Sequence, residues 1–438
     1  MNKQMLYVSF PICVAIIVAG AWLTHAGPLT PPPGPVTSTG RFSPRTEITG
    51  LPFTIASSGS YYLGSSLLAP GPGVGITISA NNVDIDLNGF ELIGVGGGPG
   101  DTAVALTGGF TNTAVHDGTI RGWGDVGLNL GLGSYAHVYN VRAHDCNGDG
   151  IRLGSWGIAR NCIAASNAVG IITIENCKIT NCVTPNNLLD GLIAGFGSHV
   201  SHCVSSNNGR RGFLLIGECA LIGSTANLNA EHGVEAFTSC RISDCTASDN
   251  GAGGALGSGF LTDDGNDLEG CAADRNLEDG IVLLTRGTCV NSTANDNGDD
   301  GFDVTSATVA NCEASQNGAN GILASQSLIK SSTTHDNTLA GINVTDGCHV
   351  YRNNSNSNIG DGIIASGSLN NIEFNHCVTN GGAAIMTTNG GPDSVMSNRE
   401  SGNGMTYVTE AADSVGPIFV GPGLVVTAPA DKFVNISY

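Results

Sequence analysis

Apolar and polar positions recur along this chain at a nearly fixed step. A glycine followed by an apolar residue returns every 20 or 21 positions through more than half of the sequence, with one step of 26 residues. The glycines of this column are Gly150, Gly170, Gly191, Gly212, Gly233, Gly259, Gly280, Gly301, Gly321, Gly341 and Gly362. A period of this length predicts a solenoid, because one coil can bury its apolar face only against its neighbours.

The residues that follow each glycine alternate between the inside and the outside of the expected coil. The first is always apolar, the second is mixed, and the third is small or aliphatic with an occasional threonine. This in-out-in alternation is typical of a strand and not of a helix. Strands stacked coil on coil predict parallel sheets around a shared core.

Two further columns precede the glycine. Most coils carry an asparagine four residues before it, and a cysteine or serine lies five residues before that asparagine. The asparagines are Asn187, Asn208, Asn229, Asn250, Asn276, Asn297, Asn317, Asn337 and Asn358. The small residues are Cys162, Cys182, Cys203, Ser224, Cys245, Cys271, Ser292, Cys312 and Ser332. We expect the small residues to stack inside. We expect each asparagine to take a left-handed corner and to hydrogen-bond the asparagine of the next coil.

These columns resemble the right-handed parallel β-helix proteins of the pectin-lyase superfamily. The segment Gly75–Phe90 looks like the first coils of that fold, and His116–Trp123 is similar to the coil that usually follows. The resemblance covers roughly residues 47–385. It implies an all-β chain, a single-stranded right-handed parallel β-helix with coils of about 20–21 residues. A dozen or more coils would form a rod on the order of 60 Å long.

Both ends of the chain lack the period. Lys3 and the apolar stretch Leu6–Leu23 read as an export signal, and we expect residues 1–26 to be cleaved. The 18-residue stretch is also long enough for an uncleaved anchor. A Pro-rich linker, residues 27–46, follows, and residues 386–438 are expected to cap the last coil. We therefore expect a secreted, periplasmic or cell-surface protein without membrane contact after cleavage.

The overall charge limits the partners. Lys and Arg number 17 against 37 Asp and Glu, so the net charge is −20 at pH 7. Nucleic acid and anionic membranes both require a basic footprint, and we expect neither as a partner. A polyanionic sugar also fits poorly unless cations bridge the two molecules. We expect a monomer.

The chain has 14 cysteines, one of them, Cys13, inside the signal segment. Export permits disulfides. However, residues stacked on adjacent coils have parallel Cβ vectors, which do not point at each other. We expect mostly reduced, buried thiols.

The most unusual local feature is acidity, because eleven carboxylates fall between Asp263 and Asp303. Asp279 and Asp300 precede the glycine on adjacent coils, Asp299 lies beside Asp300, and Asp303 points outward on the next strand. Stacked carboxylates repel each other, and a bound cation or a raised pKa relieves the repulsion. Four such groups suit Ca²⁺, which takes six to eight oxygen ligands. The alternative is that they are solvated corner residues, since Asp149, Asp190 and Asp361 occupy the same position on other coils.

The acidic segment Asn297–Val304 is similar to the calcium motif of the family 9 pectate lyases. The resemblance implies that Asp279, Asp299, Asp300 and Asp303 bind Ca²⁺. In that family a lysine about two coils onward abstracts the C5 proton of the uronate. This chain has Leu323 or Asn343 at the comparable positions, and Lys330 lies elsewhere on its coil.

The aspartates that bind the metal in this motif are thus present, but the lysine that acts as the base is missing, so no catalytic residue is assigned. We expect an exported β-helix protein that contacts polysaccharide on its outer sheet without retained lyase activity. One alternative is a catalytic lyase or epimerase acting on uronate polymers. Another is a structural or adhesive cell-surface protein. Glu235, Arg211 and His232 could touch a sugar, but they are more simply read as exposed surface residues.

Overall fold

The computed structural model describes residues 45–438 except 255–256, 417, 421–423, 426–434 and 438. Residues 44–438 form one compact unit. The expected signal segment and most of the Pro-rich linker lie outside the described residues. Within the described part there is no helix with the length and apolar character needed to cross a bilayer.

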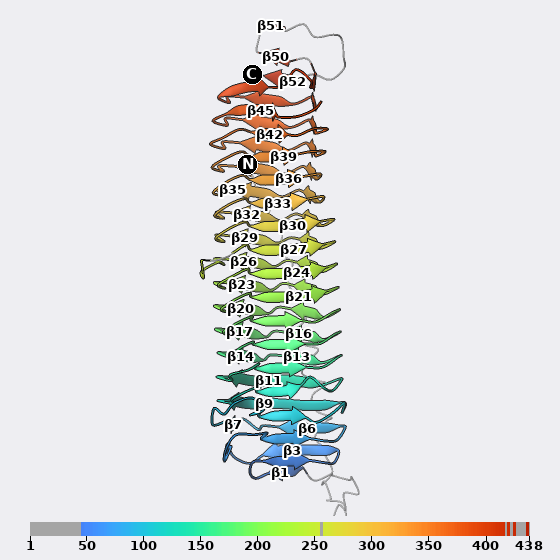
Figure 1. Cartoon of the computed structure of the whole chain (residues 1–438), viewed down its shortest axis with the longest axis vertical. Helices are drawn as coiled ribbons and strands as arrows, with labels where there is room; N and C mark the ends of the chain where they lie inside the picture. The colour runs from blue at the N-terminus through green and yellow to red at the C-terminus, as the bar shows by residue number, and fades with distance from the viewer. Residues whose placement is uncertain (1–44, 255–256, 417, 421–423, 426–434, 438) are drawn as a thin grey trace, which may run out of the picture. The chain divides into compact units, whose positions relative to one another are not determined.

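The unit is a right-handed stack of coils that climbs from the N-terminal to the C-terminal strands (Figure 1). Each regular coil contributes one strand to a first sheet and two short strands to a second sheet, all paired in parallel with the neighbouring coils. The first sheet has 17 strands among the described residues. The stack is therefore about 80 Å long at 4.8 Å per coil, which is more than the dozen coils expected as a minimum.

The strands of the first sheet follow the glycine column or, on a few coils, the residue that stands in its place. They are β2 (Phe53–Ile55), β5 (Ile76–Ile78), β8 (Val104–Leu106), β10 (Leu128–Leu130), β12 (Ile151–Leu153), β15 (Ile171–Thr173), β18 (Leu192–Ala194), β21 (Phe213–Gly217), β24 (Val234–Thr238), β27 (Phe260–Asp264), β30 (Ile281–Thr285), β33 (Phe302–Thr305), β36 (Ile322–Ser325), β39 (Ile342–Thr345), β42 (Ile363–Ser366), β45 (Ala383–Thr388) and β48 (Met405–Val408).

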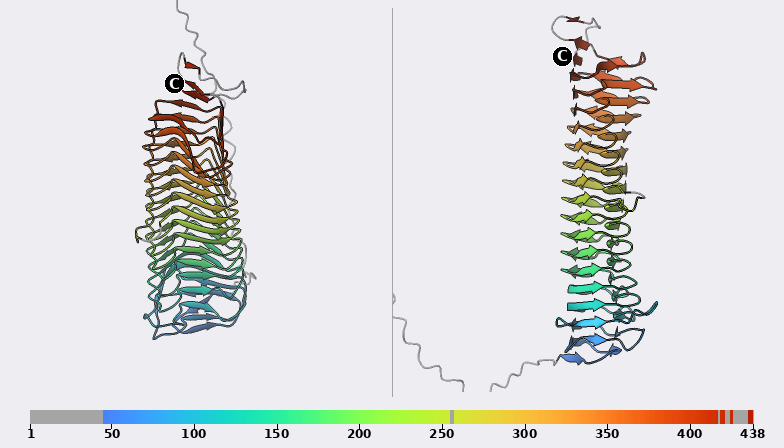
Figure 2. Two further views of the ribbon diagram at one scale, coloured as in Figure 1. Left: turned by 45° about the horizontal axis from the view of Figure 1, so that its top comes forward. Right: turned by 90° about the vertical axis from the view of Figure 1, so that its left-hand side faces the viewer.

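The second sheet bends within each coil and so covers two sides of the core (Figure 2). Its first side consists of β1 (Thr46–Ile48), β3 (Gly59–Leu63), β6 (Val83–Asp86), β9 (Thr113–Arg121), β11 (His137–His144), β13 (Ile158–Arg160), β16 (Lys178–Thr180), β19 (His199–Ser201), β22 (Ala220–Ile222), β25 (Arg241–Ser243), β28 (Asp267–Glu269), β31 (Thr288–Val290), β34 (Thr308–Ala310), β37 (Leu328–Lys330), β40 (His349–Tyr351), β43 (Asn371–Glu373), β46 (Ser394–Met396) and β49 (Ser414–Val415).

The other side consists of β4 (Leu67–Leu68), β7 (Glu91–Ile93), the second halves of β9 and β11, β14 (Ile163–Ala165), β17 (Val183–Pro185), β20 (Val204–Ser206), β23 (Thr225–Asn227), β26 (Thr246–Ser248), β29 (Ala272–Asp274), β32 (Thr293–Asn295), β35 (Glu313–Ser315), β38 (Thr333–His335), β41 (Asn354–Asn356), β44 (His376–Val378), β47 (Arg399–Ser401) and β52 (Asn435–Ser437). β50 (Ile418–Val420) and β51 (Leu424–Val425) form an antiparallel pair near the C-terminus.

The corners of the coil are single residues in the left-handed conformation. One coil turns at Trp156, Asn161 and Ser166, whose φ angles are 60°, 53° and 55°. On the coils with the asparagine column, the left-handed residue is the one before the asparagine, for example Asn186 before Asn187. The expectation that the column itself takes the left-handed corner is therefore wrong.

The asparagine column instead forms a buried ladder of side-chain amides, which confirms the other half of the expectation. Asn187 donates from Nδ2 to Oδ1 of Asn208 over 3.0 Å, and its backbone N–H donates to the same oxygen over 3.0 Å. Its Nδ2 also donates to the carbonyl of Ala164. The pattern repeats along the stack, so buried amides bond to one another and to backbone, as burial of polar groups requires.

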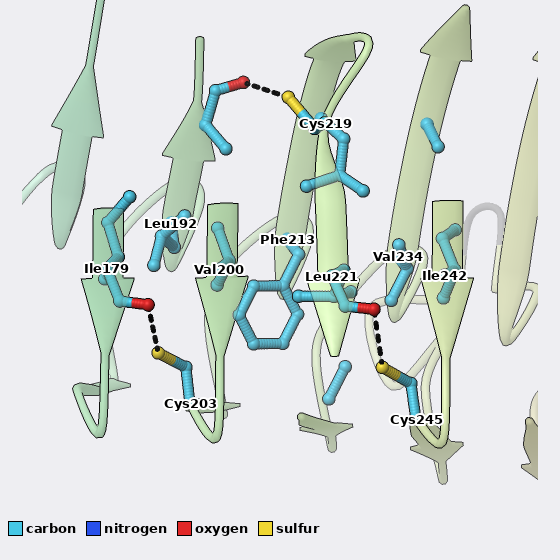
Figure 3. Close-up of a cluster of buried hydrophobic side chains, with 14 of the residues drawn as sticks. Ile179, Leu192, Val200, Cys203, Phe213, Cys219, Leu221, Val234, Ile242 and Cys245 are labelled. Atoms are coloured by element: carbon cyan, nitrogen blue, oxygen red, sulfur yellow. Dashed lines mark hydrogen bonds between the residues drawn. The ribbon is translucent and has the colours of Figure 1, made fainter. Parts of the chain in front are cut away.

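The core is filled by inward side chains of all three sides, and the cysteine column is part of it (Figure 3). Cys203 and Cys245 donate weakly from Sγ to the carbonyls of Ile179 and Leu221, at 3.9 and 3.5 Å. All thirteen cysteines of the described residues are buried and free. The thiols accordingly lie within the core, where solvent does not reach them.

The coils continue beyond the boundary expected at residue 385. β46, β47 and β48 pair in parallel with β43, β44 and β45. At the last coil β52 pairs with β47 and with β50, so part of the open sheet edge is covered by the end of the chain.

Candidate functional site

The acidic residues predicted to bind a metal lie where two adjacent coils enter the first sheet. Asp279 and Asp300 directly precede Gly280 and Gly301, which lead into β30 and β33. The backbone N–H of Asp300 donates to Oδ1 of Asp279 over 3.0 Å. The structure thus stacks the two carboxylates as their column in the sequence predicts.

An aspartate in this column has a structural role that repeats along the stack. Oδ1 of Asp300 accepts from the backbone N–H and from Nδ2 of Asn320, at 2.7 and 2.9 Å. Asp190 accepts in the same way from the N–H of Arg211 over 3.3 Å. Asp149, Asp190 and Asp300 are buried, with exposed fractions of 3–7%. These three aspartates are therefore not solvated corner residues. One oxygen of Asp190 and one of Asp300 accept from the next coil, whereas Asp149 accepts from Arg152 on its own coil.

Three of the four predicted ligands come close together. One carboxylate oxygen each of Asp279, Asp299 and Asp300 lies within 4.8 Å of the others, and Asp299 is exposed. Asp303 is not part of this tight group. It lies on the outer face of β33, in register with Val282 and Leu323. We call these four residues the acidic ridge. Among the described residues, none of them forms an ion pair with a basic side chain.

The acidic ridge carries raised pKa values. Burial, together with the charges of Asp300, Asp303 and Asp299, raises the pKa of Asp279 to about 7. Burial and the neighbouring charges of Asp299 and Asp303 raise the pKa of Asp300 to about 6, although its bonds to Asn320 act in the opposite direction. The pKa of Asp303 is raised for the same reasons. A cluster of this kind takes up either protons or a cation near neutral pH.

A second charged group lies two to three coils before the ridge, and two of its members differ from expectation. Arg211 and His232 are buried, not exposed, with exposed fractions of 8% and 6%. Arg211 donates from Nε to Asp190 over 2.7 Å and from Nη1 to Glu235 over 2.7 Å. His232 accepts at Nδ1 from the backbone N–H of Ser258. The Arg211 guanidinium and Nδ1 of His232 are thus occupied within the coils, and of the three residues Glu235 is the least buried.

The lysines lie away from the ridge. Lys178 belongs to β16 and Lys330 to β37, both strands of the second sheet. Lys432 lies outside the described residues. Leu323 and Asn343 occupy the outward positions of β36 and β39, where the resemblance places a base. Within the described part of the chain, no lysine stands over the acidic ridge.

One further cluster was not predicted from the sequence. His116 lies with Nδ1 2.8 Å from Asp117 and with Nε2 3.2 Å from Asp84, and Asp86 is also close. The sequence did contain a signal for this cluster, because Asp86 and His116 occupy outward positions in register on the neighbouring strands β6 and β9. Both imidazole nitrogens already contact carboxylates, so the cluster is explained as a hydrogen-bonded network without an ion.

Comparisons with known proteins bear on the fold. Residues 192–328 match the family model described as "Right handed beta helix region". No curated protein matches the sequence. Among solved structures, the A-module of the mannuronan C-5 epimerase AlgE4 of Azotobacter vinelandii is similar at 15% identity and a TM-score of 0.28, over 85% of this chain and 91% of that one.

Two further structures are similar at the same level. The pectate lyase Pel9A is 16% identical over 63% of this chain and 80% of its own, with a TM-score of 0.33. A tailspike protein of an E. coli bacteriophage, solved with a pentasaccharide, is 12% identical over 83% and 73%, with a TM-score of 0.34. Similarities this low say nothing about the substrate or the reaction of this chain. The family match and the strand pairing agree on a right-handed parallel β-helix.

Proposed function

We propose that this right-handed parallel β-helix protein is exported, binds Ca²⁺ on the acidic ridge, and contacts polysaccharide on the outer face of its first sheet without retained lyase activity. The observation that carries the proposal is the stacking of partly buried carboxylates without a basic partner. Like charges at this spacing destabilise one another unless a cation or protons intervene. Ca²⁺ is the cation that prefers a set made only of oxygen ligands.

The ligand set is sufficient in number. Asp279 and Asp300 each use Oδ1 for a backbone N–H of the next coil, which leaves their second oxygens for a metal. Asp299 is exposed and offers both oxygens. Asp303 adds negative charge on the outer face and acts electrostatically on Asp279 and Asp300. Water and a ligand carboxylate would complete the six to eight oxygens that Ca²⁺ takes.

A polysaccharide partner fits the surface beside the ridge. The outer face of the first sheet combines aliphatic side chains, such as Leu261 and Leu323, with the carboxylates Glu235 and Asp263. Binding sites for small molecules commonly combine apolar area with a few polar groups. A bound Ca²⁺ would let this acidic protein accept the carboxylates of a uronate polymer.

Among the described residues no lysine and no arginine without a carboxylate partner lies beside the acidic ridge, which favours binding over catalysis. Proton abstraction requires a group within hydrogen-bond reach of the proton. Of the basic side chains described near the ridge, Arg211 is held by Asp190 and Glu235, and Arg286 is paired with Asp264.

Calcium titration by calorimetry tests the proposal, with Asp300→Asn/Asp303→Asn as the disabling variant. Asp361→Asn is the matched control, because Asp361 occupies the same column outside the acidic ridge. Binding should require deprotonated ligands. With pKa values of about 7 and 6 for Asp279 and Asp300, the apparent Kd should rise on the order of a hundredfold from pH 7.5 to pH 5.5.

A parallel assay at 235 nm on polygalacturonate and alginate tests the lyase alternative, whereas epimerisation would leave this absorbance unchanged. Calcium binding that the double variant loses, with no change in absorbance, supports the proposal. A calcium-dependent rise in absorbance would instead establish the lyase alternative. If millimolar Ca²⁺ does not bind to the unmodified chain, the metal site is excluded.

A further inference from the structure

A patch of aromatic side chains lies on the early coils, away from the acidic ridge. Tyr135 and Trp156 occupy the corner that leads into β11 and β13 on adjacent coils. Their ring centroids are 6.5 Å apart and the rings are inclined by only 20°. Both side chains are more than half exposed, at 59% and 52%. The pair thus presents two nearly parallel rings to solvent.

Packing does not explain why aromatic residues stand at this corner. Tyr135 and Trp156 adopt left-handed φ angles of 58° and 60°, which bulky side chains disfavour. The next six coils place polar residues or glycine there: Asn176, Gly197, Glu218, Ser239, Gly265 and Arg286. Leu369, in the same column at a φ of 65°, is also exposed, so the left-handed corner tolerates a bulky side chain, and what sets Tyr135 and Trp156 apart is that two aromatic rings stand side by side on adjacent coils.

The aromatic surface continues onto the outer face of the second sheet. The rings of Tyr139 and His116 are stacked at 4.5 Å with an angle of 6°, and His137 lies 4.9 Å from Tyr139. Arg160 lies over the Tyr139 ring at 5.9 Å. Tyr139 is in register with both His116 and Arg160, and His137 with the exposed Ile158. Positions 135, 137 and 139 therefore place aromatic side chains at alternate positions of one coil, the first at its corner and the other two on β11.

The charges around the surface indicate what it can bind. Asp84, Asp86 and Asp117 surround His116, so an anionic ligand would be repelled there. These carboxylates can accept hydrogen bonds from hydroxyl groups. The exposed rings of Tyr135 and Trp156 offer flat faces that suit the C–H faces of sugar rings, whereas Tyr139 lies between His116 and Arg160 and offers its polar edge to hydroxyl groups.

We propose that Tyr135, Trp156, His137 and Tyr139 form a calcium-independent binding surface for a neutral oligosaccharide. The inference rests on the proposed function in taking a glycan as the partner, but it uses a different surface and a different sugar class. The two surfaces can therefore succeed or fail separately.

Affinity electrophoresis of the purified chain tests the proposal, with hydroxyethylcellulose, galactomannan, xylan and dextran as neutral probes and polygalacturonate as the anionic one. At least one neutral probe should retard the chain in the presence of a calcium chelator. Trp156→Ala should weaken that binding at least tenfold, Tyr135→Ala should weaken it to a lesser degree, and Trp156→Phe should retain part of it. Phe374→Ala is the matched control, because Phe374 is also an exposed aromatic residue at a left-handed φ of 57°.

Retardation by no neutral probe overturns the inference, as does retardation that Trp156→Ala leaves unchanged. Calcium-dependent retardation by polygalacturonate alone would support the proposed function and reject the aromatic surface. Sedimentation of the same variants tests whether the aromatic surface is instead an interface between copies of the chain. If the chain self-associates and Trp156→Ala abolishes this, the surface is a protein interface and the glycan assignment is wrong.

Discussion

At the scale of single residues, the period of this chain has two separate physical causes. The glycine column is required by space, because a Cβ atom at Gly301 would lie 2.6 Å from the carbonyl oxygen of Gly321 and 2.7 Å from Nδ2 of Asn317. The asparagine column is required by hydrogen bonding, because each buried amide is the partner of the next. Both columns recur with the coil because each interaction joins equivalent positions one coil apart.

Substituting one glycine of the column should therefore be costly. We expect Gly301→Ala to destabilise the protein by about 2 kcal/mol or more, because a methyl group is forced into a filled space. Urea unfolding followed by circular dichroism measures the change. Gly98→Ala is the control, since a Cβ there would meet no atom within 4 Å. Equal stability of the two variants would show that close packing is not the reason for the glycine.

The acidic ridge shows how far residue-level reasoning reaches from sequence. The stacking of Asp279 on Asp300 was predictable, because both residues occupy one column on adjacent coils. Their burial was not, because it follows from a rotamer in which Oδ1 turns back to the backbone of the next coil. The same limit applies to Arg211, whose burial depends on ion pairs with Asp190 and Glu235 that no spacing reveals.

At the scale of elements, three short strands and three corners make one coil, and the sequence predicts the first strand best. The strand after the glycine is marked by alternation, whereas the others are three-residue segments between polar corners. The boundary at residue 385 was misplaced for a related reason. The next member of the glycine column is Ala384, 22 residues after Gly362, so the pattern fades although the strands continue. The asparagine ladder persists there through Asn380 and Asn403.

The cysteine columns lead to an element-level prediction. Because all thirteen described thiols are buried, the folded chain without residues 1–26, and therefore without Cys13, should react with a water-soluble disulfide reagent at fewer than one thiol per molecule within an hour. The reagent should titrate the thiols once urea unfolds the coils. This holds even for Cys219, whose pKa is lowered to about 6 chiefly by its contact with Cys240, because access limits the reaction as well as thiolate formation. Rapid reaction in the folded state would contradict the tight core.

At the scale of the whole molecule, the chain is an acidic stack whose charge is unevenly distributed. The net charge is −20, and the acidic ridge concentrates part of it where carboxylates are partly buried. The solenoid and its parallel strands could be predicted from periodicity, since they depend on features repeated in every coil, whereas the right-handed β-helix was implied by the family resemblance. The aromatic surface on β11 and β13 could not, because it departs from the repeat on only a few coils.

Stability should depend on pH in a direction set by the acidic ridge. The pKa values of Asp279 and Asp300 rise to about 7 and 6 on folding, so the folded state binds more protons than the unfolded state between about pH 4 and pH 7. Their contribution to the free energy of unfolding is thus present below about pH 4 and is lost as pH rises through 6 and 7. Without calcium, Tm should fall by roughly 2 °C or more between pH 5.5 and pH 7.5.

The variant Asp279→Asn/Asp300→Asn isolates this effect from the general repulsion of an acidic chain. We expect it to lose most of the decrease in Tm between the two pH values, while Asp361→Asn keeps it. Calcium should restore the Tm of the unmodified chain at pH 7.5 and leave the double variant unchanged. An identical pH profile for both variants would locate the decrease elsewhere.

The long coil between Asn250 and Gly259 has a consequence for how such a chain can change over generations. Five extra residues follow Asn250, yet Asn250 still bonds Asn276 and Gly259 still leads into β27. Additions at a corner therefore leave the cross-section of the stack intact. Duplication of a whole coil preserves it as well, because the new coil presents the same glycine, asparagine and apolar positions to both neighbours. Duplication or deletion of whole coils can thus lengthen or shorten the stack in steps of about 4.8 Å while the packing of the interior stays the same.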